Sequence, residues 1–200
     1  MHLLMPIVLA AFVVSGCAGD RTMTLDPGPL GGAPDPAASG RPVTVAPVVD
    51  RRGAIAESES GDGIGGLYGV REWPAALLVS EPYSVALQHA LVAALTARGI
   101  PAVSSPPGPA NPAEAYVMST TIVDFYGVSN WGAQATLSAY VRLTGPDGSY
   151  VADKTVRSEV NKWIGLDSLT PRLEDVMNRV MREWVEAVAS DPQITGPLRQ

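Results

Sequence analysis

The sequence predicts an α/β (α+β) two-layer sandwich, in which one mixed sheet carries both helices on the same face. One observation is strict alternation of apolar and polar residues from Ala133 to Thr144, which gives a strand with one buried and one exposed face. The other is a pair of helical segments, each with a single apolar stripe, that need one sheet face to cover. The predicted order is β-α-β-β-β-α, in a chain of 200 residues that suits one domain and a tail.

The chain begins with a short apolar run. Leu3 to Val14 is interrupted only by Pro6. At about a dozen residues it is shorter than the roughly 20 that span a bilayer, so it fits a secretory signal peptide. The run ends in Val14-Ser15-Gly16-Cys17, which resembles the lipobox of bacterial lipoproteins: small residues fit the signal peptidase, and the thiol takes the lipid. The resemblance implies removal of residues 1–16.

Cys17 would then be the acylated first residue of the mature chain. The alternative is a free cysteine buried in a core, but the residues that follow offer no core to join. Ala18 stands where Asp would retain an enterobacterial lipoprotein in the inner membrane, so the sorting rule favours the outer membrane. Residues 17–41 are rich in Gly, Pro, Ala and Asp and are expected to be a disordered tether. Residues 42–200 are expected to be a single α/β domain.

The domain is expected to open with a β-branched strand, Val43–Val49, in which Pro47 marks an end or an edge. A long loop follows. Ser80 is expected to cap the first helix, which places Tyr83, Leu87, Leu91 and Leu95 on one stripe and ends at Gly99. The Pro-rich residues 101–112 are expected to be a connection.

Three further strands are expected at 115–127, 133–144 and 150–160, the last two joined by a tight turn at Gly145–Gly148. Thr170 is expected to cap the final helix, with Pro171 in its first turn. That helix carries an apolar stripe through Trp184, whose ring is expected to lie between the helix and the sheet.

Composition excludes several function classes. The net charge of −6 argues against a nucleic-acid partner. A single Cys rules out an internal disulfide and a cysteine-built zinc site. Signal removal leaves His89 as the one histidine, so we expect neither a metal site nor a cofactor.

Two loop motifs have weak functional interpretations. Gly61–Gly66 matches the G-x-G-x-x-G motif of dinucleotide sites, which needs a strand before it and a helix after it, because the helix N-terminus binds pyrophosphate. Here an acidic stretch precedes the motif, and the residues that follow do not predict a helix. Glu57, Glu59 and Asp62 suggest calcium, yet the twelfth position counted from Glu57 is Tyr68, not the required Glu. A flexible acidic loop explains both motifs.

Four single residues are site candidates: His89, Asp124, Trp131 and Trp73. His89 lies off the apolar stripe and is expected on the surface. Asp124 is either a ligand or acid/base group, or an outward-facing strand residue, or a residue paired with Arg142 or Arg157. Trp131 and Trp73 lie in predicted loops and are candidate partner contacts, because aromatic residues anchor interfaces; alternatively, each covers an open end of the core.

The combined pattern resembles the YajG family of bacterial lipoproteins. The resemblance rests on the lipobox and on four features of residues 43–198. These features are a first strand that ends in Asp50-Arg51-Arg52, the dipeptide Ile64-Gly65, the element order, and a final helix that ends at 189–194. The same architecture resembles the PqiC-type auxiliary lipoproteins of lipid-transporting ABC systems. Neither family brings a set of catalytic residues.

We therefore expect a non-catalytic envelope lipoprotein, anchored through Cys17 and facing the periplasm from the outer membrane. Its expected partners are the membrane, through the anchor, and an envelope protein, lipid or peptidoglycan. The alternative is an auxiliary subunit of an ABC-type lipid transporter. A third interpretation is an envelope hydrolase that uses Ser or Asp with His89.

Overall fold

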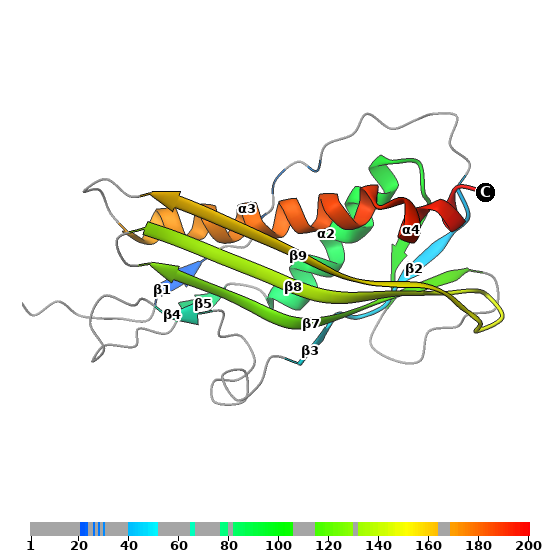
Figure 1. The fold of residues 1–200 in the computed structure, drawn as a ribbon, viewed down its shortest axis with the longest axis horizontal. Coiled ribbons are helices and arrows are strands. Elements are labelled where there is room, and N and C mark those ends of the chain that lie inside the picture. Colours follow the sequence, from blue (N-terminus) through cyan, green and yellow to red (C-terminus); the bar gives the residue numbers. More distant parts are fainter. Residues whose placement is uncertain are drawn as a thin grey trace, which may run out of the picture.

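The computed structural model describes residues 21–23, 26, 28, 30, 40–51, 65–66, 77–79, 82–105, 115–129, 132–163 and 169–200 (Figure 1). Cys17, Trp73 and Trp131 lie outside these residues.

The main sheet is mixed. Its strands are β2 (Val43–Val45), β3 (Val49–Asp50), β4 (Gly65–Gly66), β6 (Ala102–Ser104), β7 (Tyr116–Ser129), β8 (Gly132–Thr144) and β9 (Tyr150–Trp163). The order is β6-β2-β7-β8-β9, and β3 and β4 also pair with β7. The pairings that involve β2, β3, β4 and β6 are parallel, whereas β7, β8 and β9 form an antiparallel meander. A separate parallel pair joins β1 (Arg21–Met23) to β5 (Leu77–Val79).

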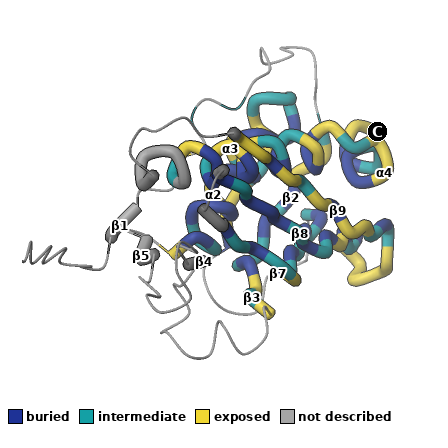
Figure 2. The backbone as a smooth tube through the Cα atoms, turned by 60° about the vertical axis from the view of Figure 1, so that its left-hand side comes forward, coloured by how far each residue is buried: buried dark blue, intermediate teal, exposed yellow. Residues whose placement is uncertain are grey.

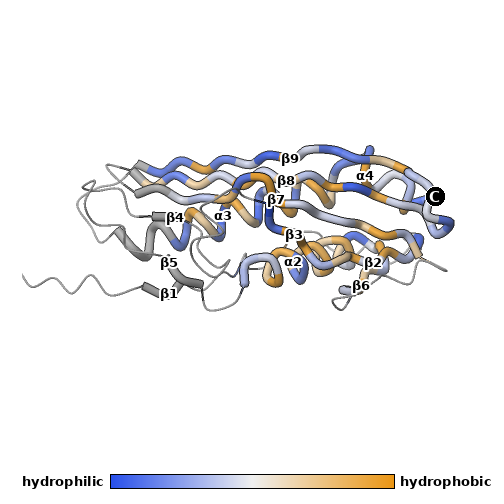
Figure 3. The backbone as a smooth tube through the Cα atoms, turned by 90° about the horizontal axis from the view of Figure 1, so that it is seen from below, coloured by the Kyte–Doolittle hydropathy of each residue, from blue (hydrophilic) through white to orange (hydrophobic). Residues whose placement is uncertain are grey.

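Two helices, α2 (Tyr83–Ala97) and α3 (Leu169–Ser190), pack on the same face of the sheet, and α4 (Pro192–Thr195) and the 3-10 turn η1 (Gly196–Leu198) follow (Figures 1 and 3). This confirms the predicted two-layer sandwich. The alternation in β8 acts as expected, because Ala133, Leu137, Val141 and their odd-numbered neighbours are buried beneath the helices (Figure 2). Trp184 on α3 is 0% exposed at the centre of this core.

Three local expectations differ from the structure. α2 begins at Tyr83, with Pro82 at its N-cap and no side-chain cap, so Ser80 does not start the helix. α3 begins at Leu169, so Thr170 lies inside it. The connection expected at 101–112 contains β6. This strand has three residues, too few to show a periodicity in the sequence, and it forms by pairing in parallel with β2.

Both ends of the described domain meet. The Arg41 amide donates to the carbonyl of Leu198 over 2.7 Å, and the Gly40 amide donates to the carbonyl of Gly99 over 3.3 Å. The residues that precede β2 therefore lie beside η1, near the C-terminus.

Candidate functional site

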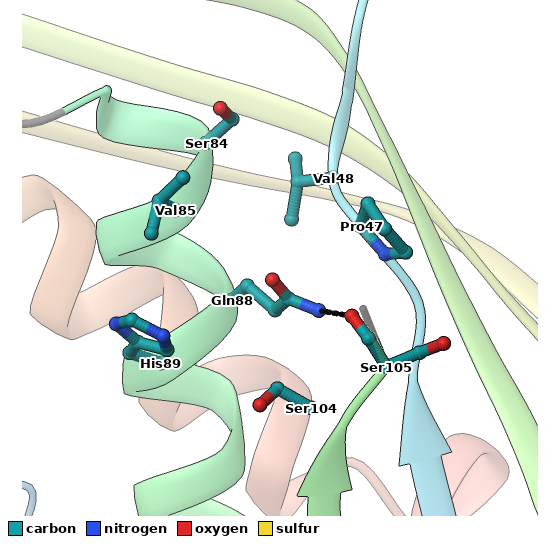
Figure 4. Close-up of a pocket in the computed structure, with 8 residues that line it drawn as sticks. All are labelled: Pro47, Val48, Ser84, Val85, Gln88, His89, Ser104 and Ser105. Atoms are coloured by element: carbon teal, nitrogen blue, oxygen red, sulfur yellow. Dashed lines mark hydrogen bonds between the residues drawn. The ribbon is translucent and has the colours of Figure 1, made fainter. Parts of the chain in front are cut away.

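A pocket lies at the carboxyl ends of the parallel strands β2 and β6, beside α2. Gln88 on α2 is buried, and its amide Nε2 donates to the carbonyl oxygens of Val45, at 2.8 Å, and Ser105, at 3.2 Å. Val45 is the last residue of β2, and Ser105 directly follows β6. One side chain therefore holds the helix against the ends of both strands (Figure 4). Ligands of open α/β sheets bind at such carboxyl ends.

The pocket has a volume of about 400 Å³, at the lower end of the usual range for ligand sites. It is lined by Pro47, Val48, Ser84, Val85, Gln88, His89, Ser104 and Ser105. Among the described residues, this lining combines apolar surface with hydroxyl, amide and imidazole groups, and none of them is a carboxylate, lysine or arginine. It therefore suits a neutral ligand that can form hydrogen bonds.

The structure places His89 on the exposed side of α2, as predicted, but at the margin of this pocket (Figure 4). Sequence reasoning missed the pocket. Gln88 and His89 are adjacent polar residues on a helix, and the sequence does not show which of them is buried. Gln88 is buried because β2 and β6 end beside it, whereas His89 stays exposed.

Other predicted sites take structural roles. Gly65 and Gly66, the end of the glycine motif, form β4 and pair with Gly127 and Val128, so they do not begin a helix. Asp124 follows a bulge in β7 and pairs across the strands with Ser138 on the face opposite the helices, which supports the outward-facing interpretation. Within the described residues, no group of His, Cys, Asp and Glu is arranged to hold a metal ion.

The sheet face opposite the helices carries a polar network around Glu159. Gln134 and Asn161 both donate to Glu159 Oε1, at 3.1 and 3.2 Å, and Arg157 donates to Oε2 at 3.2 Å. The hydrogen bonds from Asn161 and Arg157 lower the pKa of Glu159. The bond from Gln134 crosses from β8 to β9, whereas the bonds from Arg157 and Asn161 lie within β9, so the network supports the pairing of these two strands through Gln134.

A second cluster lies nearer the β8–β9 turn. The Tyr140 and Tyr150 hydroxyls both bind Asp153, and Arg142 donates to the Tyr140 hydroxyl at 3.1 Å while stacking over its ring. The hydrogen bond with Tyr140 raises the pKa of Arg142. Both carboxylate oxygens of Asp153 therefore accept hydrogen bonds within the cluster.

Comparisons with known proteins show the fold. No protein-family model and no curated protein matches the sequence. A DUF330 protein from Xanthomonas campestris has a similar structure, with a TM-score of 0.61 and 13% identity over 88% of this chain and 96% of that one. A second solved structure, of an uncharacterized protein, gives a TM-score of 0.54 and 16% identity over 86% and 97% of the two chains.

A putative lipoprotein from Caulobacter crescentus aligns less closely, with a TM-score of 0.41 and 17% identity over 69% of this chain and 94% of that one. Among the described residues, no helix is long and apolar enough to span a bilayer. The chain thus shares the two-layer fold of the DUF330 protein along almost the whole length of both.

Proposed function

We propose that the protein is a non-catalytic, YajG-like lipoprotein of the bacterial envelope, anchored through acylated Cys17 on the periplasmic side of the outer membrane. Its domain binds an uncharged segment of an envelope protein in the pocket beside Gln88. The observation that carries this proposal is the neutral lining of that pocket. The described residues of this lining offer no lysine or arginine to bind lipid phosphates, and no charged group of either sign to bind peptidoglycan stems, apart from the imidazole of His89.

The edge strand β6 supports a protein ligand. Among the described residues, β6 pairs with β2 on one side only, and Val103 is 61% exposed. An extended peptide that pairs with β6 would carry its next side chain toward Ser104 and the pocket.

The anchor is tested by Cys17→Ser. The wild type is expected to take up a fatty-acid analogue and to fractionate with membranes, and the variant is expected to do neither. Label retained by the variant would contradict the lipobox assignment.

The pocket is tested by placing a photoreactive amino acid at Ser104, with Thr96 on the exposed face of α2 as the matched control position. Crosslinking of an envelope protein from Ser104 and not from Thr96 supports the proposal. A crosslink to the permease or ATPase of a lipid transporter would instead favour the ABC-auxiliary alternative.

The hydrolase interpretation is tested by His89→Ala. Because His89 is exposed at the margin of the pocket, we expect this variant to keep both its urea melt and its ability to complement a deletion strain. Loss of complementation with an unchanged melt would restore the enzyme hypothesis.

A further inference from the structure

The segment between the proposed anchor and the sheet contacts α3 at Asp26 and Gly28 and the core at Leu30. The Asp26 amide donates to Asn178 Oδ1 at 2.9 Å. Gly28 passes so close to Arg182 that a Cβ atom there would lie 3.1 Å from Nη2 of its guanidinium group. Leu30 packs against the core.

The backbone of this segment is adapted to its position. Gly28 has a φ of 69°, in the left-handed region that favours glycine, and its amide donates to Asp26 Oδ1 at 2.8 Å. In sequence it lies between Pro27 and Pro29, which restrict the unfolded chain and so reduce the entropy lost when the segment binds α3.

The pairing of β1 with β5 shortens the free tether. A free coil from Cys17 to Arg41 would have an end-to-end length of roughly 25–30 Å and could present any side of the domain to the membrane. With β1 paired to β5, only four residue steps separate Cys17 from Arg21, and four extended steps span at most about 14 Å.

β1 lies at the end of the domain where α3 begins and β9 ends (Figure 1). The β8–β9 turn and the C-terminus lie at the opposite end (Figures 1 and 3). The 13 residues of β8 separate the two ends by about 40 Å. We propose that the end at which α3 begins faces the bilayer surface, and that the β8–β9 turn points away from it. This orientation rests on the proposed acylation of Cys17.

The experiment uses the acylated chain in vesicles of phosphatidylethanolamine, phosphatidylglycerol and a nickel-chelating lipid. Because acylation consumes the one native thiol, a single introduced cysteine can carry a nitroxide label. The labels are placed at two exposed positions, Asn161 near the end of β9 and Pro146 in the β8–β9 turn. Relaxation by the nickel lipid is expected to be several-fold stronger at Asn161 than at Pro146.

Two matched insertions test the length of the free tether. A Gly-Ser insert of about 20 residues, with an end-to-end length of roughly 25 Å, is placed either between Gly19 and Asp20 or between Ala33 and Pro34. The first lengthens the free tether and is expected to abolish the difference between the labels. The second lies beyond the contacts and is expected to preserve it.

Equal relaxation of the two labels in a chain whose lipid is confirmed by mass spectrometry would overturn the orientation and leave the anchor intact. Equal effects of the two inserts would also overturn it. A mature chain without lipid would overturn the anchor and the orientation together.

Discussion

The indole nitrogen of Trp184 donates a hydrogen bond to the backbone carbonyl of Val156, 2.9 Å away, and so fastens the final helix to the outer strand of the sheet. The same ring is fully buried. Its packing and its hydrogen bond can be separated by substitution.

We predict that Trp184→Ala lowers the free energy of unfolding by about 3–5 kcal/mol, because it opens a cavity in the core. Trp184→Phe keeps most of the packing but leaves the Val156 carbonyl without its donor, at a cost of about 1–3 kcal/mol. Trp131→Ala is expected to cost well under half as much as Trp184→Ala. Urea melts of residues 18–200 measure all three, and a larger loss for Trp131→Ala would mean that α3 does not close the core.

The ion pair between Arg98 on α2 and Glu186 on α3 is partly buried, with side-chain exposures of 15% and 30%. Arg98→Met leaves the carboxylate without its charge partner, and we predict a loss of about 1–3 kcal/mol, at the lower end of effects for buried pairs because of residual solvent screening. Arg179 forms an exposed pair with Glu183 at 2.9 Å and supplies the control. Arg179→Met should cost at most about 0.5 kcal/mol, so equal losses in the two melts would argue against the helix–helix role.

Asp191 caps α4 through the Gln193 amide at 2.8 Å and accepts a hydrogen bond from Lys154 of β9 at 2.5 Å. The hydrogen bond from Lys154 is the main cause that lowers the pKa of Asp191, with the Gln193 amide as a further cause. A carboxyl whose pKa is lower in the folded state than in the unfolded state stabilises the fold at pH values above its unfolded pKa, which for Asp is about 3.9. That contribution is lost as the pH falls through the folded pKa.

Asp191→Asn should therefore be less stable than the wild type at neutral pH, and the gap should close as the pH falls below about 4. Urea midpoints measured across this range test the sign. Lys154→Met should remove the same part of the pH dependence, and the double variant should add little to either single change. A gap that widens in acid would show that another group dominates.

Two glycines make opposite predictions for the same substitution. Gly148, in the β8–β9 turn, has a φ of 79°, so Gly148→Ala should cost about 1–2 kcal/mol, and Gly148→Asn should cost less. Gly196 has a φ of −54° and open space where a Cβ would lie, so Gly196→Ala should be neutral or stabilise by up to about 1 kcal/mol. Thermal melts that rank the two alanine variants in the reverse order would contradict these backbone assignments.

The elements that could be predicted from the sequence are those whose pattern is local and long. Alternation through β8 and the stripe through Trp184 are repeated several times within one segment, so neighbouring residues carry enough information to identify the buried face. β6 has three residues, too few to show any period, and exists because β2 offers it a parallel ladder.

The candidate site depends on contacts that no local pattern encodes. Gln88 is buried by two strand ends, the nearer of them 17 residues away along the chain. Asp26 meets Asn178 across 152 residues of sequence. Composition identified residues 17–41 as low in apolar side chains, but the contacts of Asp26, Gly28 and Leu30 use backbone groups, a close approach and one leucine, which composition does not detect.

The hydrogen bond between Arg41 and Leu198 has a practical consequence for engineering this fold. Because the two ends of the domain touch, a short peptide could join Gln200 to Arg41, and new termini could be opened at the exposed Pro146–Asp147 turn without breaking a strand. In such a circular permutant a lipid attached at the new N-terminus would hold the domain by its opposite end.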